Sequence, residues 1–305
     1  MRRGERAVNI TITGASGLIG RRLMKLLGGE KHSLHVLSRH AGTNLPVGVR
    51  LSAWDALKGE PPGESVREAD VVIHLAGEPV AQRWTEEAKR KIRESRVTGT
   101  RNLVQALARL SRRPQALICA SAVGYYGSRG EEMLVESSAP GSDYLAEVCR
   151  AWEAEASAAE ALGIRVACLR TGVVLDARGG ALKGMLPPFR MGVGGRLASG
   201  RQWMPWIHIQ DLVDLYRFAA EKPIQGALNA TAPYPVTNSD FTHALAAALK
   251  RPAVFPIPEF ALRMIFGEMA GILLASQRAL PKAAEAAGFQ FRFPQLGPAL
   301  ADVLK

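Results

Sequence analysis

Cysteine is scarce and widely spaced in this sequence. The 305 residues contain three cysteines, Cys119, Cys149 and Cys168, and no two of them form a Cys-x-x-Cys pair. Such spacing argues against a disulfide framework and against a cysteine-rich metal cluster. We therefore predict that the chain binds no metal and that it works in the reducing cytoplasm.

Long apolar runs are also absent. Behind the basic N-terminal arm, Thr11 and Thr13 interrupt the apolar run that a signal peptide would need. The longest apolar candidate, 260–275, contains Arg263 and Glu268 and is shorter than the roughly 20 residues of a membrane span. We expect an amphipathic or buried helix there, and no membrane partner.

Acidic residues are outnumbered by basic ones, 28 against 39, so the formal net charge is +11. This charge would attract phosphorylated ligands or nucleic acid, and alone it does not choose between them. Its scatter along the chain is typical of a solvated basic surface. The five tryptophans and five tyrosines form no obvious stacking array, so we expect a small-molecule substrate and no nucleic acid. The sequence leaves open whether the chain forms a homodimer.

The first half of the chain alternates short apolar runs with helical patterns. This alternation predicts an α/β fold of the Rossmann type, with a doubly wound parallel sheet and helices on both faces. The predicted strands are 8–13, 34–38, 71–76, 116–121 and 165–169, and the predicted helices are 18–27, 85–110 and 144–162.

Glycine and proline pairs interrupt the pattern from about residue 179 onward. We therefore predict a Rossmann domain over 1–178 and a smaller α/β C-terminal region over 179–305 that covers the substrate. A run near 227–231 could return to the first domain as one more strand, and 238–250 has a helical pattern.

A glycine-rich loop follows the first predicted strand and opens the first predicted helix. Here Gly14 permits a tight turn, Gly17 lets the backbone approach a pyrophosphate, and Gly20 lets the helix approach the strand. The N-terminus of the helix offers free N–H groups and a positive dipole end to phosphates. The alternative is a purely structural turn. The predicted dinucleotide contacts are Gly14, Ala15, Ser16, Gly17, Leu18, Ile19 and Gly20.

No acidic residue stands where NAD-binding proteins usually hold the ribose hydroxyls, about 20 residues after the loop. The second predicted strand ends instead in Ser38, Arg39 and His40. A guanidinium can pair bidentately with a 2′-phosphate, and Ser38 can donate a further hydrogen bond. We therefore predict NADP as the cofactor, the alternative being that Arg39 is an ordinary surface residue.

A third contact region follows the strand predicted at 71–76. That strand runs into Leu75, Ala76 and Gly77, and small residues at the carboxyl end of a strand leave room for a cofactor. Glu78 follows them, and we interpret it as a charged loop residue rather than as an acid or base.

One arginine lies on the apolar face of the helix predicted at 85–110. A rotation of about 100° per residue puts Arg96 in one stripe with Ile92 and Leu103, whereas Arg90 points the other way. Since an unpaired buried charge is costly, Arg96 needs an anionic or carbonyl partner. A cofactor phosphate or a loop carboxylate could serve.

Several blocks of the sequence together carry a family resemblance. They are 14–20, 74–79, 121–127 and 206–211, with 186–190 and 276–281 in the C-terminal half. Over nearly its whole length the chain resembles the extended short-chain dehydrogenases/reductases, and more narrowly their atypical "epimerase family protein" subgroup. The resemblance implies NADP in an extended groove, with the glycine loop, Ser38, Arg39, 75–77 and Arg96 as contacts.

The chain departs from this family at the expected catalytic helix. Ordinary members carry Tyr-x-x-x-Lys, in which the lysine lowers the pKa of the tyrosine and the tyrosine exchanges a proton with the substrate. Alignment on Glu153 puts Leu145 and Cys149 at these positions, and alignment on Tyr144 puts Val148 four residues later. We predict that this helix packs rather than catalyses, and that Cys149 is an inert buried thiol.

Other groups must then supply the proton. Ser121, Tyr125 and Tyr126 follow the strand whose end borders the nicotinamide in similar proteins, so we predict the donor among them. The tyrosines are alternatively packing residues with hydrogen-bonded hydroxyls. We interpret His208, in an apolar run, as a structural residue.

Two functions are consistent with the sequence. The resemblance implies an NADP-dependent oxidoreductase or epimerase acting on a carbonyl or secondary alcohol of a sugar-like or nucleotide-linked small molecule. The glycine-rich segment 192–200 favours this enzyme. The missing tyrosine and lysine favour the alternative, a non-catalytic module that binds NADP and senses redox state.

Overall fold

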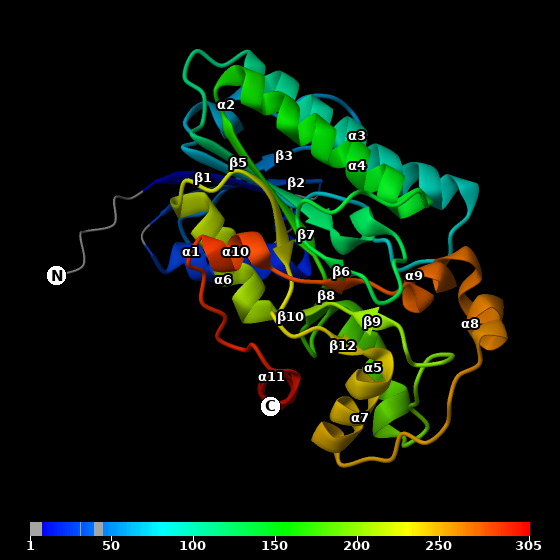
Figure 1. The fold of residues 1–305 in the computed structure, drawn as a ribbon. Coiled ribbons are helices and arrows are strands. Elements are labelled where there is room, and N and C mark those ends of the chain that lie inside the picture. Colours follow the sequence, from blue (N-terminus) through cyan, green and yellow to red (C-terminus); the bar gives the residue numbers. More distant parts are fainter. Residues whose placement is uncertain (1–7, 31, 40–44) are drawn as a thin grey trace.

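The structure, a computed structural model, describes residues 8–30, 32–39 and 45–305 (Figure 1). Its centre is a sheet of seven parallel strands in the order β11, β7, β5, β4, β1, β2, β3. The chain order reverses between β1 and β4, and open α/β sheets bind ligands at such a switch point. The strands are β1 (Asn9–Thr13), β2 (Ser33–Ser38), β3 (Arg50–Ala53), β4 (Val71–His74), β5 (Ala116–Ala122), β7 (Arg165–Thr171) and β11 (Gly226–Ala230).

Helices cover both faces of this sheet (Figure 1). One face packs against α1 and α6, and the other packs against α2, α3 and α4. In β4, Val71 and Ile73 join the first core and Val72 joins the second, which is why this strand is apolar throughout. The helices are α1 (Leu18–Gly28), α2 (Gly63–Arg67), α3 (Glu86–Ala108), α4 (Tyr144–Ser157) and α6 (Ile209–Glu221), with 3-10 turns at Val123–Tyr126 and Ala158–Leu162.

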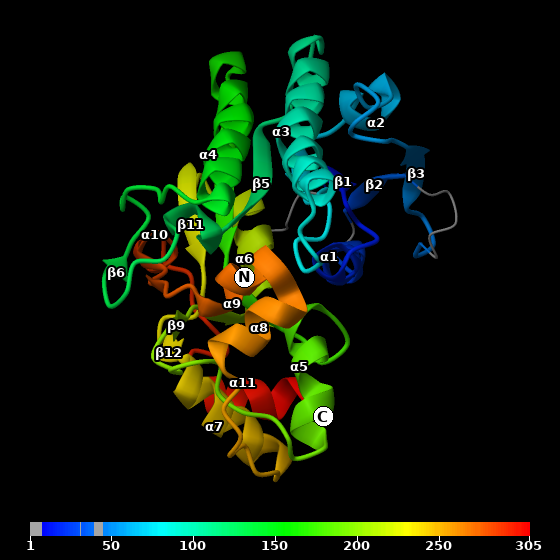
Figure 2. The same ribbon diagram turned by 90° about the vertical axis from the view of Figure 1, so that its right-hand side faces the viewer.

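A third core lies outside the sheet, where α5, α7 and α11 gather at one end of the molecule (Figure 2). The fully buried Trp206 lies in this core. The helices are α5 (Gly180–Arg190), α7 (Asn238–Leu249) and α11 (Leu296–Val303). Two short strand pairs flank them, namely β8 (Val173–Leu175) with β10 (Trp206–His208) and β9 (Trp203–Met204) with β12 (Val236–Thr237). A further pair, β6 (Met133–Leu134) with β13 (Arg278–Ala279), belongs to a small core around Tyr126.

The predicted fold class is confirmed, and each predicted strand begins and ends within two residues of the observed one. The strand near 227–231 is present as β11 and pairs with β7. Sequence analysis missed β3, a partly exposed edge strand without a strong apolar run, and α6, which returns to the sheet. The division of the chain at residue 178 stays a prediction.

The helix expected over 260–275 is broken in two. Gly267 has a φ of +61° and ends α8 (Glu259–Phe266), and a 3-10 turn (Gly267–Met269) then leads into α9 (Ala270–Leu274). The short α10 (Lys282–Ala286) follows and packs on β11. Across the described ranges, none of the helices combines the length and apolarity needed to cross a membrane.

A buried carboxylate ties α6 to the C-terminal segment. Asp211 is 1% exposed, and its two oxygens accept the backbone N–H groups of Arg292 at 2.8 Å and Phe293 at 2.9 Å. Burial raises the pKa of Asp211, and these two hydrogen bonds oppose the rise. Asp211 therefore binds the segment before α11 to α6 through two hydrogen bonds.

We expect Asp211→Ala to lower the free energy of unfolding by about 1–3 kcal/mol, because two backbone N–H groups lose their acceptor. The matched control is Asp214→Ala on the same helix, whose carboxylate lies 3.9 Å from the Arg217 guanidinium and is more exposed. It should cost less than about 1 kcal/mol. Urea denaturation measures both, and equal losses would contradict the role of Asp211.

Candidate functional site

The glycine loop packs directly on the chain that follows β4. Gly14 has a φ of +68°, and a Cβ at this position would lie 2.7 Å from the backbone of Leu75. Gly20 likewise meets the Cα of Ala15, at 2.5 Å from its would-be Cβ. The two glycines therefore do what the sequence predicts of them, except that Gly20 lets α1 approach the loop rather than the strand.

The N-terminus of α1 is open to an anion. Its N-cap, Gly17, offers no side-chain cap, and the first turn contains no acidic residue. The backbone N–H groups of this turn therefore have no side-chain acceptor at the cap. Gly179 lies against Leu18, with 2.9 Å between its would-be Cβ and Leu18 Cδ1, so a second segment borders the loop.

A buried polar network holds the chain after β4 in place. Thr13 Oγ1 accepts the N–H groups of Leu75 and Ala76 at 3.1 Å each and lies 2.7 Å from His74 Nδ1. His74 Nε2 lies 3.0 Å from Thr100 Oγ1. Burial lowers the pKa of His74 to about 4, so the ring is neutral. Sequence analysis missed this network, because its members come from three separate elements.

Arg39 lies at the carboxyl end of β2, where the sequence predicts it. Its side chain is 60% exposed, and Nη1 is 3.8 Å from Glu78 Oε2 in the segment after β4. Ser38 beside it is buried. His40 lies outside the described residues.

Arg96 points inward from α3, as its helical stripe predicts. Its Nη1 donates to the carbonyl oxygens of Glu78 at 2.9 Å and Ile92 at 3.1 Å. The guanidinium also lies over the Trp152 ring of α4, with Cζ 5.1 Å from the ring centre. Burial lowers the pKa of Arg96. The partners are thus carbonyls, one of the two kinds expected, and Arg96 supports the loop after β4.

Ser121, at the end of β5, meets a buried ion pair. Its hydroxyl donates to Glu153 Oε1 at 2.6 Å. Arg170, on β7, binds the same carboxylate bidentately, with Nε 2.9 Å from Oε1 and Nη2 2.8 Å from Oε2. Although burial lowers the pKa of Arg170, the bonds to Glu153 outweigh it and raise this pKa above its ordinary value. Arg170 therefore stays charged.

Both tyrosines of the predicted set contact this ion pair. Tyr126 is fully buried, and its hydroxyl donates to Asn229 Oδ1 at 2.7 Å and accepts from Arg170 Nη1 at 3.0 Å. Tyr125 is partly exposed, and its ring centre lies 3.4 Å from the Arg170 guanidinium carbon. The three predicted residues thus converge on one centre. Sequence analysis missed Glu153 and Arg170 as partners, although a charged residue ending an apolar strand was a usable signal.

Helix α4 packs against this centre without offering a tyrosine–lysine pair. A Cβ at Gly124 would lie 3.4 Å from Leu145 Cβ and 3.9 Å from Cys149 Sγ. Burial raises the pKa of Cys149 to about 12, so its thiol stays protonated. Tyr144 instead donates its hydroxyl to the carbonyl of Lys89 at 2.5 Å, which joins α4 to α3.

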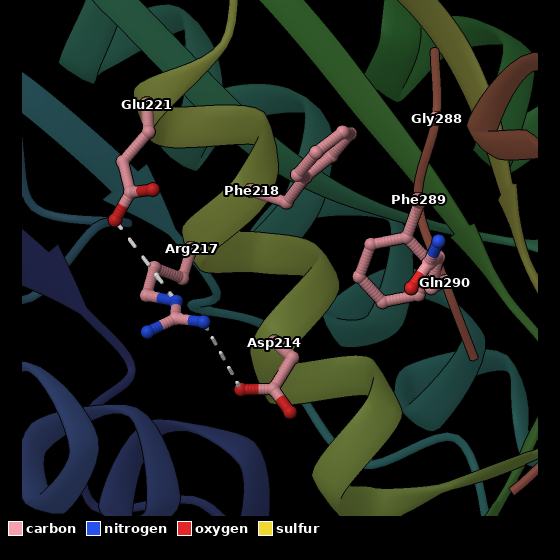
Figure 3. Close-up of a pocket in the computed structure, with 7 residues that line it drawn as sticks. All are labelled: Asp214, Arg217, Phe218, Glu221, Gly288, Phe289 and Gln290. Carbon is pink, nitrogen blue, oxygen red and sulfur yellow. Dashed lines mark ion pairs between the residues drawn. The ribbon is translucent and has the colours of Figure 1, made fainter. Parts of the chain in front are cut away.

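A separate small pocket of about 270 Å³ lies on α6, away from the glycine loop (Figure 3). Arg217 occupies it between Asp214 and Glu221, at 3.9 Å from each, and also binds Glu30. Glu30, His32 and Glu221 have potential metal ligands within 4.8 Å of one another. Because Arg217 already pairs with both glutamates, we assign no metal to this pocket.

Comparisons with known proteins match nearly all of the chain. The model for the NAD dependent epimerase/dehydratase family matches residues 10–231, and the model for a domain of unknown function, DUF1731, matches 257–303. The chloroplastic epimerase family protein SDR39U1 homolog of Arabidopsis thaliana is 38% identical over 311 residues, which cover 99% of this chain and 88% of that protein.

Two solved structures are similar over almost all of this chain. Human epimerase family protein SDR39U1 (isoform2), solved with NADPH, has a TM-score of 0.86 and 33% identity, covering 97% of this chain and 98% of its own. The nucleoside-diphosphate sugar epimerase of Corynebacterium glutamicum has a TM-score of 0.79 and 39% identity, covering 98% of this chain and 58% of its own.

The position of Arg96 generates a test with a matched control. Arg96→Ala leaves two carbonyls and the Trp152 face without their cation, so we expect the free energy of unfolding to fall by about 1–3 kcal/mol. Arg90 is exposed on the opposite face, and its one ion pair among the described residues is with Glu94, at 3.5 Å. Arg90→Ala should stay within about 0.5 kcal/mol of the parent in urea denaturation. Similar losses in the two variants would refute the inward role of Arg96.

Proposed function

Because the chain belongs to the NAD dependent epimerase/dehydratase family, we propose that it is an NADP-dependent oxidoreductase or epimerase. Its substrate is a sugar-like or nucleotide-linked small molecule that reacts at a carbonyl or a secondary alcohol. The observation that carries this proposal is the Gly14 turn, which places an uncapped helix N-terminus beside the chain after β4. The NADPH in the similar human structure and the sugar-nucleotide description of the Corynebacterium protein support it.

The residues of the glycine loop fit a dinucleotide. The cradle at Gly14 leaves no space for a Cβ, and the first turn of α1 offers N–H groups to a pyrophosphate. On this proposal Arg39 pairs with the 2′-phosphate, and Leu75, Ala76 and Gly77 line the groove, positioned by Arg96. The bound nicotinamide supplies or accepts the hydride.

The proposed NADP preference rests on the exposed guanidinium of Arg39. Arg39→Asp should remove most of a preference for NADPH over NADH, because a bidentate charge-assisted pair worth roughly 1.5–3 kcal/mol is lost. Calorimetry of both cofactors measures the effect. Arg109→Asp is the control, since that side chain is 75% exposed and pairs with Glu60 at the distant end of α3. Equal affinities of the parent for NADPH and NADH would sink the proposal.

For proton transfer we favour Ser121 among the three residues that converge on Arg170. Its hydroxyl already donates to Glu153 Oε1, and Arg170 binds the same carboxylate bidentately, which fixes the position of this acceptor. Ser121 then passes a proton between the reacting oxygen of the substrate and Glu153. Tyr125 has an exposed edge and is the next candidate, whereas the hydroxyl of Tyr126 is enclosed by Asn229 and Arg170.

The catalytic proposal predicts a pattern across four variants. At least one of Ser121→Ala, Tyr125→Phe and Tyr126→Phe should lower kcat by about 100-fold, with cofactor affinity retained. Tyr144→Phe should leave NADPH-dependent turnover nearly intact, because the Tyr144 hydroxyl is bonded to the Lys89 carbonyl. Steady-state kinetics on a responsive carbonyl substrate provide the measurement. Abolition of turnover by Tyr144→Phe alone would instead make α4 the catalytic helix.

A specific observation favours a second function, a non-catalytic module that binds NADP and senses redox state. Neither alignment of α4, on Glu153 or on Tyr144, gives a tyrosine with a lysine four residues later, and Ser121 is only 4% exposed. Such a protein would bind NADPH with the Arg39 preference yet turn over none of a broad set of carbonyls and sugar nucleotides. That outcome would replace the enzyme proposal.

A further inference from the structure

A second groove of about 700 Å³ lies between α1, the end of α5, the start of α6 and α11. None of its lining residues belongs to the glycine loop or to the Ser121 centre. The segment that follows β8 forms one wall, and the segment that precedes α11 forms another. A groove of this size is large enough for a small metabolite.

One buried donor in this groove is poorly satisfied. His208 is 3% exposed, and its Nδ1 accepts the backbone N–H of Gln210 at 3.0 Å, so its ring hydrogen is on Nε2. Within the described part of the chain Nε2 forms no hydrogen bond of good geometry, and its nearest acceptor is the half-exposed carboxylate of Asp302, with Oδ2 at 3.3 Å. The ring is fixed by stacking on Phe293, with 3.9 Å between ring centres.

Both aspartates of the groove have a cation within ion-pair distance. Asp176 accepts from Arg22 Nη2 at 2.7 Å and from the backbone N–H of Arg178 at 2.8 Å. Asp302 lies 3.3 Å from Lys305 Nζ. Both acids therefore have a cation of their own.

Three further guanidinium groups line the groove besides that of Arg22. Arg178, Arg190 and Arg292 line the groove, and among the described residues none of their side chains forms an ion pair or hydrogen bond. Three such cations around one hollow raise the local concentration of anions. A phosphate group suits them, because its oxygens accept from several guanidiniums at once.

We propose that this groove binds the phosphate group of a small organic phosphate, such as a sugar phosphate. The guanidiniums of Arg178, Arg190 and Arg292 neutralise the phosphate, and His208 Nε2–H donates to the ligand. This site is separate from the cofactor loop and does not depend on the proposed reaction. The two sites are nevertheless close along the chain. Residues 176–178 line the groove, and the next residue, Gly179, packs on Leu18 of the glycine loop.

Calorimetry of the full chain at physiological salt, with ribose 5-phosphate as the probe, tests this site. The parent should bind in the millimolar range or tighter, and Arg190→Gln/Arg292→Gln should weaken binding at least about 10-fold. The control Arg83→Gln/Arg150→Gln removes the same charge from exposed positions elsewhere and should change affinity less than about twofold. Ribose, which has no phosphate, should not bind.

A third variant addresses the His208 donor. His208→Asn retains an acceptor for the Gln210 N–H, and asparagine is a good N-cap, so α6 keeps its start while the groove loses Nε2–H. We expect weaker ribose 5-phosphate binding by a chain that still unfolds cooperatively, although loss of the stack on Phe293 lowers its stability. Arg39→Asp should leave ribose 5-phosphate binding unaltered. The proposal is wrong if the parent does not bind, if the control pair weakens binding as much as the groove pair, or if only Arg39→Asp abolishes it.

Discussion

The buried pair of Arg170 and Glu153 is the interaction on which the catalytic half of the site depends. It joins β7 to α4, receives the Ser121 hydroxyl, and supports the rings of both tyrosines. Burial of two charges is costly, and a bidentate geometry repays that cost only while both partners are present. Loss of either partner would leave the other as an unpaired charge in the core. The pair therefore makes the end of β5, β7 and α4 a single unit.

The cofactor half of the site could be predicted from sequence because its requirements are local. The positive φ of Gly14 is a property of its own turn, Gly20 packs on Ala15 five residues away, and Arg39 is recognised by its distance from the loop. The packing of Gly14 on Leu75, in contrast, depends on the fold. The apolar stripe that predicts an inward Arg96 can be recognised within the sequence of one helix. Its carbonyl partners, in contrast, are 4 and 18 residues away, and only one of them is on its own helix.

The catalytic half was only partly predictable. Ser121 was placed by its strand, whereas Glu153 lies 32 residues further along and joins it only through the fold. The His74 network was missed for the same reason, since its threonines come from β1 and α3. On α4, Leu145 and Cys149 pack against Gly124. The polar groups of this centre are therefore Ser121 and Arg170, which come from β5 and β7 and meet α4 at Glu153.

The neutral His74 has a consequence for acid tolerance. An unfolded histidine takes up a proton near pH 6.5, whereas burial holds this pKa at about 4 in the fold. Between these two values the unfolded chain binds more protons, so stability is complete above about pH 6.5 and declines as the pH falls toward 4. The shift corresponds to roughly 3 kcal/mol. His74 contacts Thr13, and Thr13 accepts the backbone N–H groups of the segment on which Gly14 packs. Protonation of His74 in acid would therefore destabilise the glycine turn at the nucleotide site.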